Sequence, residues 1–329
     1  MKRELISLVI LTTSIAIIMG CSKKEGAATR AVVTPPVVAD TTNPAIGTPP
    51  PATWKEHWFE HIQLLNRVYY DTSVVIFFDD DVSRAITWPD NYLAKVWDYT
   101  KTTYGAFGKD SRLFAIFHAG KYGGGHPSTY MDESHDFRNT IDCGSNNLNA
   151  WTSGTGNDID LTTHEVGHIV EGASKGIHGS PAFNIWHDSK WMEIYQYDVY
   201  LDLNRPDDAV RWYNDKIATT DDFPRAGTHW FKDWFYPIYS QYGKTAVLNK
   251  FFTSLSKYFP KTTFSNGVTT YPAYSRDMNF GEFVHFWSGA AGTDLKALAL
   301  AAFGSRDDNG NDWTLQLAQA KIDFPAIVY

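Results

Sequence analysis

Five consecutive residues near the middle of the chain constrain its fold more than any other feature. They run from His164 to His168 and read His-Glu-Val-Gly-His. Residues four apart share one face of an α-helix, so a helix here would bring the two imidazoles together. Thr162, with Glu165 three residues later, has the pattern of a capping box at a helix start. We therefore expect a helix over residues 161–174 that carries both histidines on one side.

Two imidazoles on one helix face can bind a single metal ion, and zinc is the usual ion for this spacing. Glu165 then lies beside the metal, where it acts on a bound water and is not a ligand. With the composition of this chain, chance would produce the pattern about 0.01 times. The sequence therefore predicts zinc as a cofactor, with His164 and His168 as metal ligands and Glu165 as the catalytic residue.

A catalytic zinc site needs a third protein ligand in addition to an open position. The Glu residues after His168 are Glu171, Glu193 and Glu282. Glu171 follows His168 within one turn, where reaching back to the same ion is awkward. Glu193 lies in residues 186–203, a segment with helical spacing that the preceding loop allows to fold back against the first helix. We predict Glu193 as the third ligand, and three fallback ligands stay open: His178, His187 and Asp188.

This pattern, HExxH followed by 24 residues and Glu193, resembles the gluzincin metallopeptidases, the group that contains thermolysin. The resemblance implies a zincin-like α+β fold and the hydrolysis of peptide bonds by a zinc-activated water. Glu165 would take the proton of that water and later pass a proton to the leaving amine. Members of this group usually stabilise the oxyanion with a Tyr or His, for which Tyr197, His229 and Tyr239 are unranked candidates. The chain also resembles the plant-and-bacterial secretory peptidases and the mucin-active lipoprotein peptidases, and no motif decides between these two groups.

The rest of the chain divides into a mixed first part and a largely helical second part. Short apolar runs at residues 74–78 and 113–117 predict buried strands, and residues 92–104 have helical spacing. Gly123-Gly124-Gly125 predicts a loop. After residue 160 we expect further helices in five segments: 186–203, 229–259, 280–286, 293–303 and 313–321. The order agrees with an α+β fold.

The N-terminus has the pattern of a bacterial lipoprotein signal. Lys2 and Arg3 precede an apolar run over residues 5–19, which ends at Gly20-Cys21. In such a signal the Cys is lipidated and becomes the first residue of the mature chain. We therefore expect a signal peptide over residues 1–20, lipidation at Cys21 and export to the bacterial cell envelope, with a lipid anchor in the outer membrane or at the cell surface.

A polar segment rich in proline and threonine follows Cys21. Its composition over residues 21–53 predicts an extended tether that does not bury a core. The catalytic domain should then occupy residues 54–329.

The charge balance excludes one class of partner. The chain has 29 basic and 37 acidic residues, a net charge of −8, without a dense basic run. Nucleic-acid binding needs clustered Lys and Arg, so we expect no nucleic-acid partner. The expected partners are a protein, peptide or glycoprotein substrate and, through the lipid, a membrane. The alternative function is a non-catalytic surface lipoprotein that binds glycans or glycopeptides on a zincin scaffold.

A second histidine motif competes with the first. Residues 57–61 read His-Trp-Phe-Glu-His, the inverted HxxEH pattern, with Glu133 as a conceivable third ligand. The segment directly follows the tether, so we expect it to pack as a first element on the core, with His57 and His61 at a solvated edge.

Three smaller features have plain structural interpretations. The acidic loop over residues 307–312 lacks the complete EF-hand pattern, so we expect a solvated turn. Asp79-Asp80-Asp81 follows a predicted strand and indicates its end. Trp230, Trp234 and Trp287 have helical spacing and are expected in the core.

Overall fold

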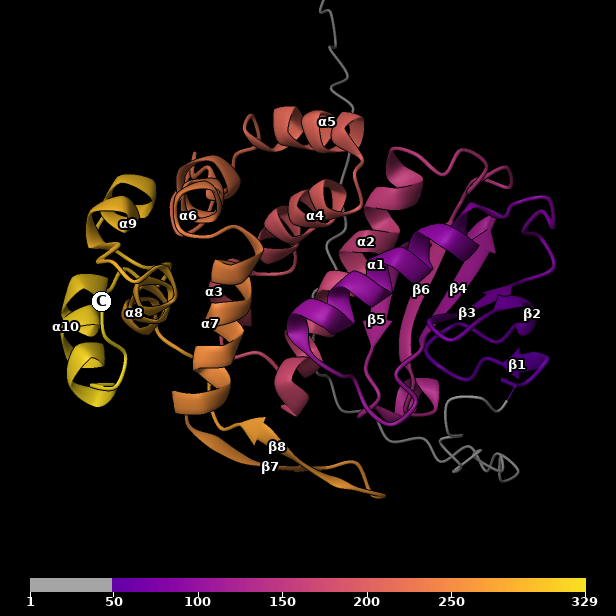
Figure 1. Cartoon of the computed structure of the whole chain (residues 1–329), viewed down its shortest axis with the longest axis horizontal. Helices are drawn as coiled ribbons and strands as arrows, with labels where there is room; N and C mark the ends of the chain where they lie inside the picture. The colour runs from indigo at the N-terminus through magenta and orange to yellow at the C-terminus, as the bar shows by residue number, and fades with distance from the viewer. Residues whose placement is uncertain (1–48) are drawn as a thin grey trace, which may run out of the picture. The chain divides into compact units, whose positions relative to one another are not determined.

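A six-stranded mixed sheet organises the first half of the described chain in this computed structural model, which describes residues 49–329 (Figure 1). The strand order is β1-β2-β3-β4-β6-β5. Strands β3, β4 and β6 are parallel to one another, while β2 and β5 run antiparallel to their neighbours. The strands are β1 (Thr53–Lys55), β2 (Leu64–Tyr70), β3 (Val74–Phe78), β4 (Leu113–Ala119), β5 (Lys121–Ser128) and β6 (Asn139–Ser145).

Two of these strands were predicted from their apolar runs. Strand β3 covers the predicted residues 74–78, and β4 extends the predicted run by two residues to Ala119. The loop predicted at Gly123-Gly124-Gly125 is wrong, because these glycines lie inside β5, the edge strand. Glycine carries no strand signal in a sequence, and here the pairing with β6 provides the backbone partners.

The alternating side chains of the sheet face two different environments. Ile76 on β3 and Phe117 on β4 belong to the large core, which includes residues of helices α1 and α2. Val75 and Ile116 point to the opposite face, where they form a smaller cluster with Trp54 and other residues. The period of two along each strand therefore separates a helix-covered face from a face covered by the first residues of the domain.

Helices make up most of the second half of the chain, beyond α2 in Figure 1. The α-helices are α1 (Trp88–Tyr104), α2 (Asn157–Ala173), α3 (Phe183–Trp186), α4 (Lys190–Asp202), α5 (Pro206–Lys216), α6 (Tyr236–Gln241), α7 (Thr245–Tyr258), α8 (Phe280–Ala291), α9 (Lys296–Phe303) and α10 (Trp313–Asp323). The other elements are the 3-10 helices η1 (Glu133–His135) and η2 (Ser174–Gly176), the π-helix η3 (Trp230–Phe235), and a hairpin of β7 (Lys261–Ser265) and β8 (Thr270–Tyr274). The α+β class is confirmed in this coarse form.

The helix that carries the histidine motif begins earlier than its capping pattern predicts. Helix α2 starts at Asn157, and Thr162 lies inside it, so the predicted capping box is wrong. The Thr162 hydroxyl donates to the carbonyls of Asp158 and Ile159 in the preceding turn. A threonine that bonds back to its own helix gives the same local sequence signal as an N-cap.

The longer helical predictions are interrupted in the structure. The segment predicted over residues 186–203 contains the end of α3, a short loop and then α4. The segment over residues 229–259 divides into η3, α6 and α7, with a turn in which Lys244 has a φ of 53°. Helix α5 was not predicted. Trp230, Trp234 and Trp287 are completely buried, which confirms the expectation that they belong to the core.

The predicted signal peptide, Cys21 and residues 22–48 of the tether lie outside the described residues. Over residues 49–329, each helix is too short or too polar to cross a membrane.

Candidate functional site

Helix α2 brings the two histidines of the HExxH motif into direct proximity. The Nε2 atoms of His164 and His168 are 3.1 Å apart, with the ring centroids 4.8 Å apart. His168 is buried, and His164 is partly exposed. Burial, together with His168, Lys216 and Lys190, lowers the pKa of His164 to about 3. A neutral imidazole offers its ring lone pair to a metal ion, which is the form that coordination requires.

Asp188 is the acidic residue that the structure places with these imidazoles. Its Oδ1 lies 3.5 Å from the Nε2 of His168, and the candidate ligand atoms of His164, His168 and Asp188 all lie within 4.8 Å of one another. Asp188 is in the short loop between α3 and α4, with its side chain more than half exposed. Of the three fallback ligands, Asp188 is therefore the one that lies beside both His164 and His168.

Glu193, the predicted third ligand, is engaged elsewhere. It is buried on the first turn of α4, where Lys190 donates to its carboxylate at 2.8 Å. Lys190 also pairs with Asp221 at 2.8 Å. Burial raises the pKa of Glu193 even though Lys190 opposes the shift. In the described part of the chain Glu193 is outside the His164–His168–Asp188 group, so its role as a zinc ligand stays a prediction.

The two histidine fallback ligands have other partners. The His178 ring stacks on Phe264, and its Nε2 lies 3.6 Å from Asp132. His187 pairs with Asp308 at 3.3 Å. Its backbone has a φ of 51°, an uncommon value outside glycine, directly before Asp188. Neither His178 nor His187 belongs to the group formed by His164, His168 and Asp188.

Glu171 orients the second histidine of the motif. Its Oε2 lies 3.2 Å from His168 Nδ1, and its Oε1 accepts a hydrogen bond from Trp186 Nε1 on α3. Burial alone would lower the pKa of His168, but the bond to Glu171 and the charges of nearby carboxylates, including Glu165, turn the net shift upward. A carboxylate on the far nitrogen of a ligating histidine fixes the ring orientation. Glu171 therefore ties the histidine helix to the segment that leads to Asp188.

The side chain of Glu165, on α2, lies against the edge strand β5. It is 3% exposed, and a Cβ added to Gly125 of β5 would come within 2.6 Å of its Oε1. Burial raises the pKa of Glu165 to about 7, with His168 opposing and Asp188 and Asp142 adding to the shift. A carboxyl group with this pKa can both accept and release a proton near neutral pH.

The three candidate oxyanion donors contact other groups. Tyr239 donates to Asp198, which also accepts from Tyr99 and Thr245. His229 bonds through Nδ1 to the carbonyl of Thr219. The Tyr197 ring packs against those of Tyr213, Phe231, Tyr236 and Tyr239. We therefore assign none of these three residues to the oxyanion.

The inverted HxxEH motif does not converge on one point. His57 pairs with Asp136 at 3.0 Å, and Glu60 and Glu133 are exposed. His61, expected at a solvated edge, is instead 5% exposed and lies with Glu56, His118 and Asp142. The expectation for His61 is wrong because the segment after β1 folds over the sheet and buries this ring. Sequence reasoning missed Glu56, His118 and Asp142, since isolated residues on three separate segments carry no spacing signal.

The two acidic stretches have structural roles. In the loop over residues 307–312, Asp307 accepts hydrogen bonds from the backbone of Asn309 and Asn311, and Asp312 caps α10 by accepting from Thr314. Asp79 follows β3 and accepts from the backbone of Asp81 and Val82. These contacts are those of a turn and of a strand end.

Comparisons with known proteins give a limited set of similarities. No protein-family model matches the chain, and no curated protein matches it. An M1 zinc metallopeptidase from Deinococcus radiodurans is similar in structure, with a TM-score of 0.44 and 10% identity over 77% of this chain and 51% of that chain. A mutant of the same enzyme matches with a TM-score of 0.44 and 11% identity over the same shares. A functionally unknown conserved protein from Bacillus anthracis str. Ames has a TM-score of 0.44 and 12% identity, over 75% of this chain and 50% of that chain. The chain thus spans about half the length of these solved structures.

Proposed function

We propose that this protein is a zinc-dependent peptidase whose catalytic centre is the His164–Glu165–His168 segment of α2. The observation that carries the proposal is the convergence of three donor atoms beside a buried carboxyl group. His164 and His168 face each other at 3.1 Å, and Asp188 approaches at 3.5 Å, while Glu165 is buried next to them. The proposed site would therefore have two imidazoles and one carboxylate, together with a separate acid–base group.

The donor set fits zinc in chemistry and in spacing. Ligand atoms about 2.0–2.1 Å from a tetrahedral zinc ion lie about 3.3–3.4 Å from one another. The separations of 3.1 and 3.5 Å at this site are close to that value. We propose Asp188 as the third ligand on this basis, with the sequence-predicted Glu193 as the alternative. When bound, zinc would polarise a substrate carbonyl and acidify a water molecule.

Glu165 would act as the general base and acid of peptide hydrolysis. Its carboxylate would take a proton from the attacking water and then deliver a proton to the nitrogen of the leaving amine. Burial raises the pKa of Glu165 to about 7, whereas a bound zinc ion would lower it and favour the carboxylate form that accepts the proton. Glu171 would hold the His168 ring in position throughout, through the contact at Nδ1.

The edge strand β5 supports a peptide as the substrate. An edge strand has one row of backbone N–H and C=O groups that its own sheet leaves unpaired, and an extended peptide can pair with such a row. Strand β5 is at the edge of the sheet, and its Gly125 lies against Glu165. A peptide that pairs with β5 would therefore run beside the proposed base.

We also propose that the enzyme is exported and anchored to the bacterial cell envelope through lipidated Cys21, so that its substrate is a protein, peptide or glycoprotein outside the cytoplasm. Metabolic labelling with a radioactive fatty acid tests the anchor. We expect label in the wild-type chain and none in Cys21→Ser, and equal labelling of the two proteins would contradict the anchor without affecting the peptidase proposal.

The test of the peptidase function combines metal content with cleavage. We would measure zinc per chain by elemental mass spectrometry on the detergent-solubilised full chain, and cleavage by counting new N-termini in a peptide library. His168→Ala should lose one zinc and all cleavage. Glu165→Gln should keep the zinc and lose cleavage by about 100-fold or more. An unchanged zinc content in His168→Ala would exclude this metal centre, and wild-type cleavage in Glu165→Gln would exclude Glu165 as its base. Absence of cleavage by the wild-type chain would favour the glycan-binding alternative.

A further inference from the structure

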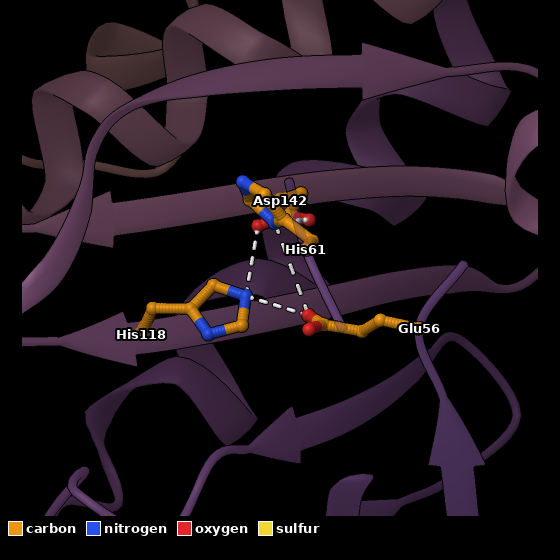
Figure 2. A group of neighbouring side chains, drawn as sticks. All are labelled: Glu56, His61, His118 and Asp142. Carbon is orange, nitrogen blue, oxygen red and sulfur yellow. Dashed lines mark hydrogen bonds and ion pairs between the residues drawn. The ribbon is translucent and has the colours of Figure 1, made fainter. Parts of the chain in front are cut away.

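Four buried side chains converge on the face of the sheet opposite to α2. Figure 2 shows Glu56, His61, His118 and Asp142 pointing toward one another. His118 and Asp142 come from the neighbouring parallel strands β4 and β6, while Glu56 and His61 come from the segment between β1 and β2. Their exposed fractions are at most 5%. Groups of this polarity are rarely buried together unless each has a partner.

The donor atoms of the four residues have the separations of a coordination shell. His118 Nε2 lies 2.9 Å from Glu56 Oε1 and 3.2 Å from Asp142 Oδ1. His61 Nδ1 lies 3.9 Å from the same Glu56 oxygen. Atoms around a tetrahedral zinc ion are about 3.3–3.4 Å apart. One ion can therefore contact an atom of each residue with small adjustments of the side chains.

Hydrogen bonds account for only part of this arrangement: His61 Nδ1 lies 2.9 Å from Asp142 Oδ2. His118 Nε2, Glu56 Oε1 and Asp142 Oδ1 are buried without a hydrogen-bond partner, although they lie close to one another. The other ring nitrogen of His118, Nδ1, is 3.0 Å from Asp79. If Nδ1 donates its proton there, the lone pair of Nε2 in a neutral ring faces two carboxylate oxygens. That juxtaposition is unfavourable unless a proton on Nε2 or a metal ion lies between them.

Contacts outside the four donor atoms hold them in place. Gln63 donates its backbone N–H to Glu56 Oε2, and Trp58 Nε1 donates to Asp142 Oδ2 at 2.7 Å. The His61 ring stacks on Tyr122 with centroids 3.8 Å apart. Each contact uses an atom or face that is not among the converging donors. Such outer partners orient the ligands of metal sites.

We propose that Glu56, His61, His118 and Asp142 bind a second divalent transition-metal ion, of which zinc is the best match. Two neutral imidazoles and two carboxylates carry a charge of −2, which a divalent cation cancels. The Asp79 oxygen that contacts His118 Nδ1 also pairs with Lys121 at 3.2 Å, so Lys121 offsets the charge of this carboxylate. Imidazole nitrogen with carboxylate oxygen suits zinc and its neighbours in the transition series better than magnesium or calcium.

A neighbouring group is weaker as a site for this ion. His126 and His135 approach the other oxygen of Asp142 at 3.6 and 3.9 Å. That oxygen already accepts the hydrogen bond from Trp58 and lies 2.9 Å from His61 Nδ1, and the group offers three donors where the first offers four. We therefore assign one ion to the group that contains Glu56.

The second ion has a structural role. All four ligands are buried, and a zinc site in which protein atoms fill every position leaves none for substrate. Glu56 and His61 belong to the first segment of the described domain, whereas His118 and Asp142 belong to two central strands. The ion would therefore fasten this segment to the sheet. Removing it should loosen residues 56–63 before the rest of the domain.

Metal stoichiometry in the full chain tests this site independently of the HExxH site. After dialysis against trace chelator, elemental mass spectrometry should give two zinc ions per wild-type chain and one in His168→Ala. The single variant His168→Ala leaves the second group intact, so a value near zero in this folded variant would overturn the second site. One ion per wild-type chain that His168→Ala removes would overturn it too and would leave the peptidase proposal standing.

Variants in the second group locate the remaining ion. His118→Ala should leave one zinc per chain, and His118→Ala with His168→Ala should leave none. His57→Ala is the matched control, because His57 lies in the same segment but pairs with Asp136, so both ions should remain. Loss of an ion in His57→Ala with no loss in His118→Ala would contradict the assignment. One ion per wild-type chain that His118→Ala removes and His168→Ala retains would support this site and exclude the peptidase centre.

Two milder changes keep the test decisive if His118→Ala does not fold. Glu56→Gln and Asp142→Asn preserve shape and remove one ligand charge each. In the His168→Ala background both should lower zinc content from one to near zero, and chelator should no longer change the melting temperature. In His168→Ala with Glu56 and Asp142 intact, chelator should lower the melting temperature by roughly 5 °C. The same melting temperature with chelator and with zinc in that background would mean that protons, not a metal, neutralise the cluster.

Discussion

Gly125 and Glu165 are in such close contact that no side chain fits between them: a Cβ on Gly125 would lie 2.6 Å from Glu165 Oε1 and 2.8 Å from its Cδ. Gly125 is on the edge strand, and Glu165 is on the histidine helix. The absence of a side chain at position 125 therefore sets where the proposed base lies. It also explains why a strand that was missed in the sequence contains glycine at this point.

The first prediction concerns this contact. Gly125→Ala should push the Glu165 carboxylate away from its position and lower kcat by roughly 10- to 100-fold, because small displacements of a catalytic group have large effects on rate. Zinc content should remain at the wild-type value. The control is Gly172→Ala in α2, the helix that carries Glu165. There the new Cβ would be 3.2 Å from the Thr129 side chain, a far less crowded position. The kcat values of the two variants test this prediction, and equal values would contradict the positioning role of Gly125.

The second prediction separates the two candidates for the third zinc ligand. Asp188 faces His168 at 3.5 Å, whereas Glu193 is bound to Lys190 at 2.8 Å. Asp188→Asn should therefore weaken zinc binding at this site by about 100-fold or more, and Glu193→Gln should leave it nearly unchanged. Competition with a chromophoric chelator measures both affinities. The opposite pattern would establish Glu193 as the ligand.

The third prediction concerns the buried ion pair of Lys190. This side chain is 5% exposed and pairs with both Glu193 and Asp221. Lys190→Met should lower the free energy of unfolding by about 3–5 kcal/mol, because it leaves buried carboxylates without a cation.

Two controls accompany the Lys190 measurement. Adding Glu193→Gln to Lys190→Met should restore part of the stability, since one of the unpaired charges is then gone. Lys95→Met, at an exposed position on α1, should change the free energy by less than about 0.5 kcal/mol. Urea unfolding measures all of these variants. A Lys190→Met protein as stable as Lys95→Met would show that the pair contributes little.

The fourth prediction is a pH dependence of stability at Asp90, in the first turn of α1. Burial and the charge of Asp71 raise the pKa of Asp90 from 3.8 to about 6. The folded state thus binds this proton more tightly than the unfolded state, so its contribution to stability is present below about pH 4 and is lost as the pH rises to 6. The full shift corresponds to about 3 kcal/mol, and partial exposure of the side chain reduces the effect to roughly 1 kcal/mol.

Asp90→Asn should therefore raise the melting temperature by roughly 2–4 °C at pH 7 and change it little at pH 4. Asp207→Asn is the control, because Asp207 is an exposed acid in the first turn of α5. It should lower stability slightly at pH 7, since it removes a favourable interaction with the helix N-terminus. A stabilisation of Asp90→Asn that is equal at both pH values would exclude titration of Asp90 as the cause.

Local periodicity predicted the parts of the fold that depend on neighbours in sequence. The apolar run over residues 74–78 predicted β3, and the four-residue spacing of His164 and His168 predicted a helix that brings their rings together. Both inferences succeed because side-chain direction repeats every 2.0 residues in a strand and every 3.6 in a helix. The same reasoning failed at Thr162, where a hydroxyl inside a helix imitates a cap.

The pairing of strands and the packing of separate elements decided the rest of the fold and of the candidate sites. Asp188 reaches His168 because α3 ends two residues earlier and α4 starts two residues later, and no pattern predicts that break in what reads as one helix. Glu56 and Asp142 are 86 positions apart, and they meet because β1 and β6 belong to one sheet and the segment after β1 folds over its far face. Spacing along a chain carries information only about residues on the same element. Contacts between elements depend on how the whole sheet pairs and which of its faces is covered, so only the tertiary structure brings these ligands together.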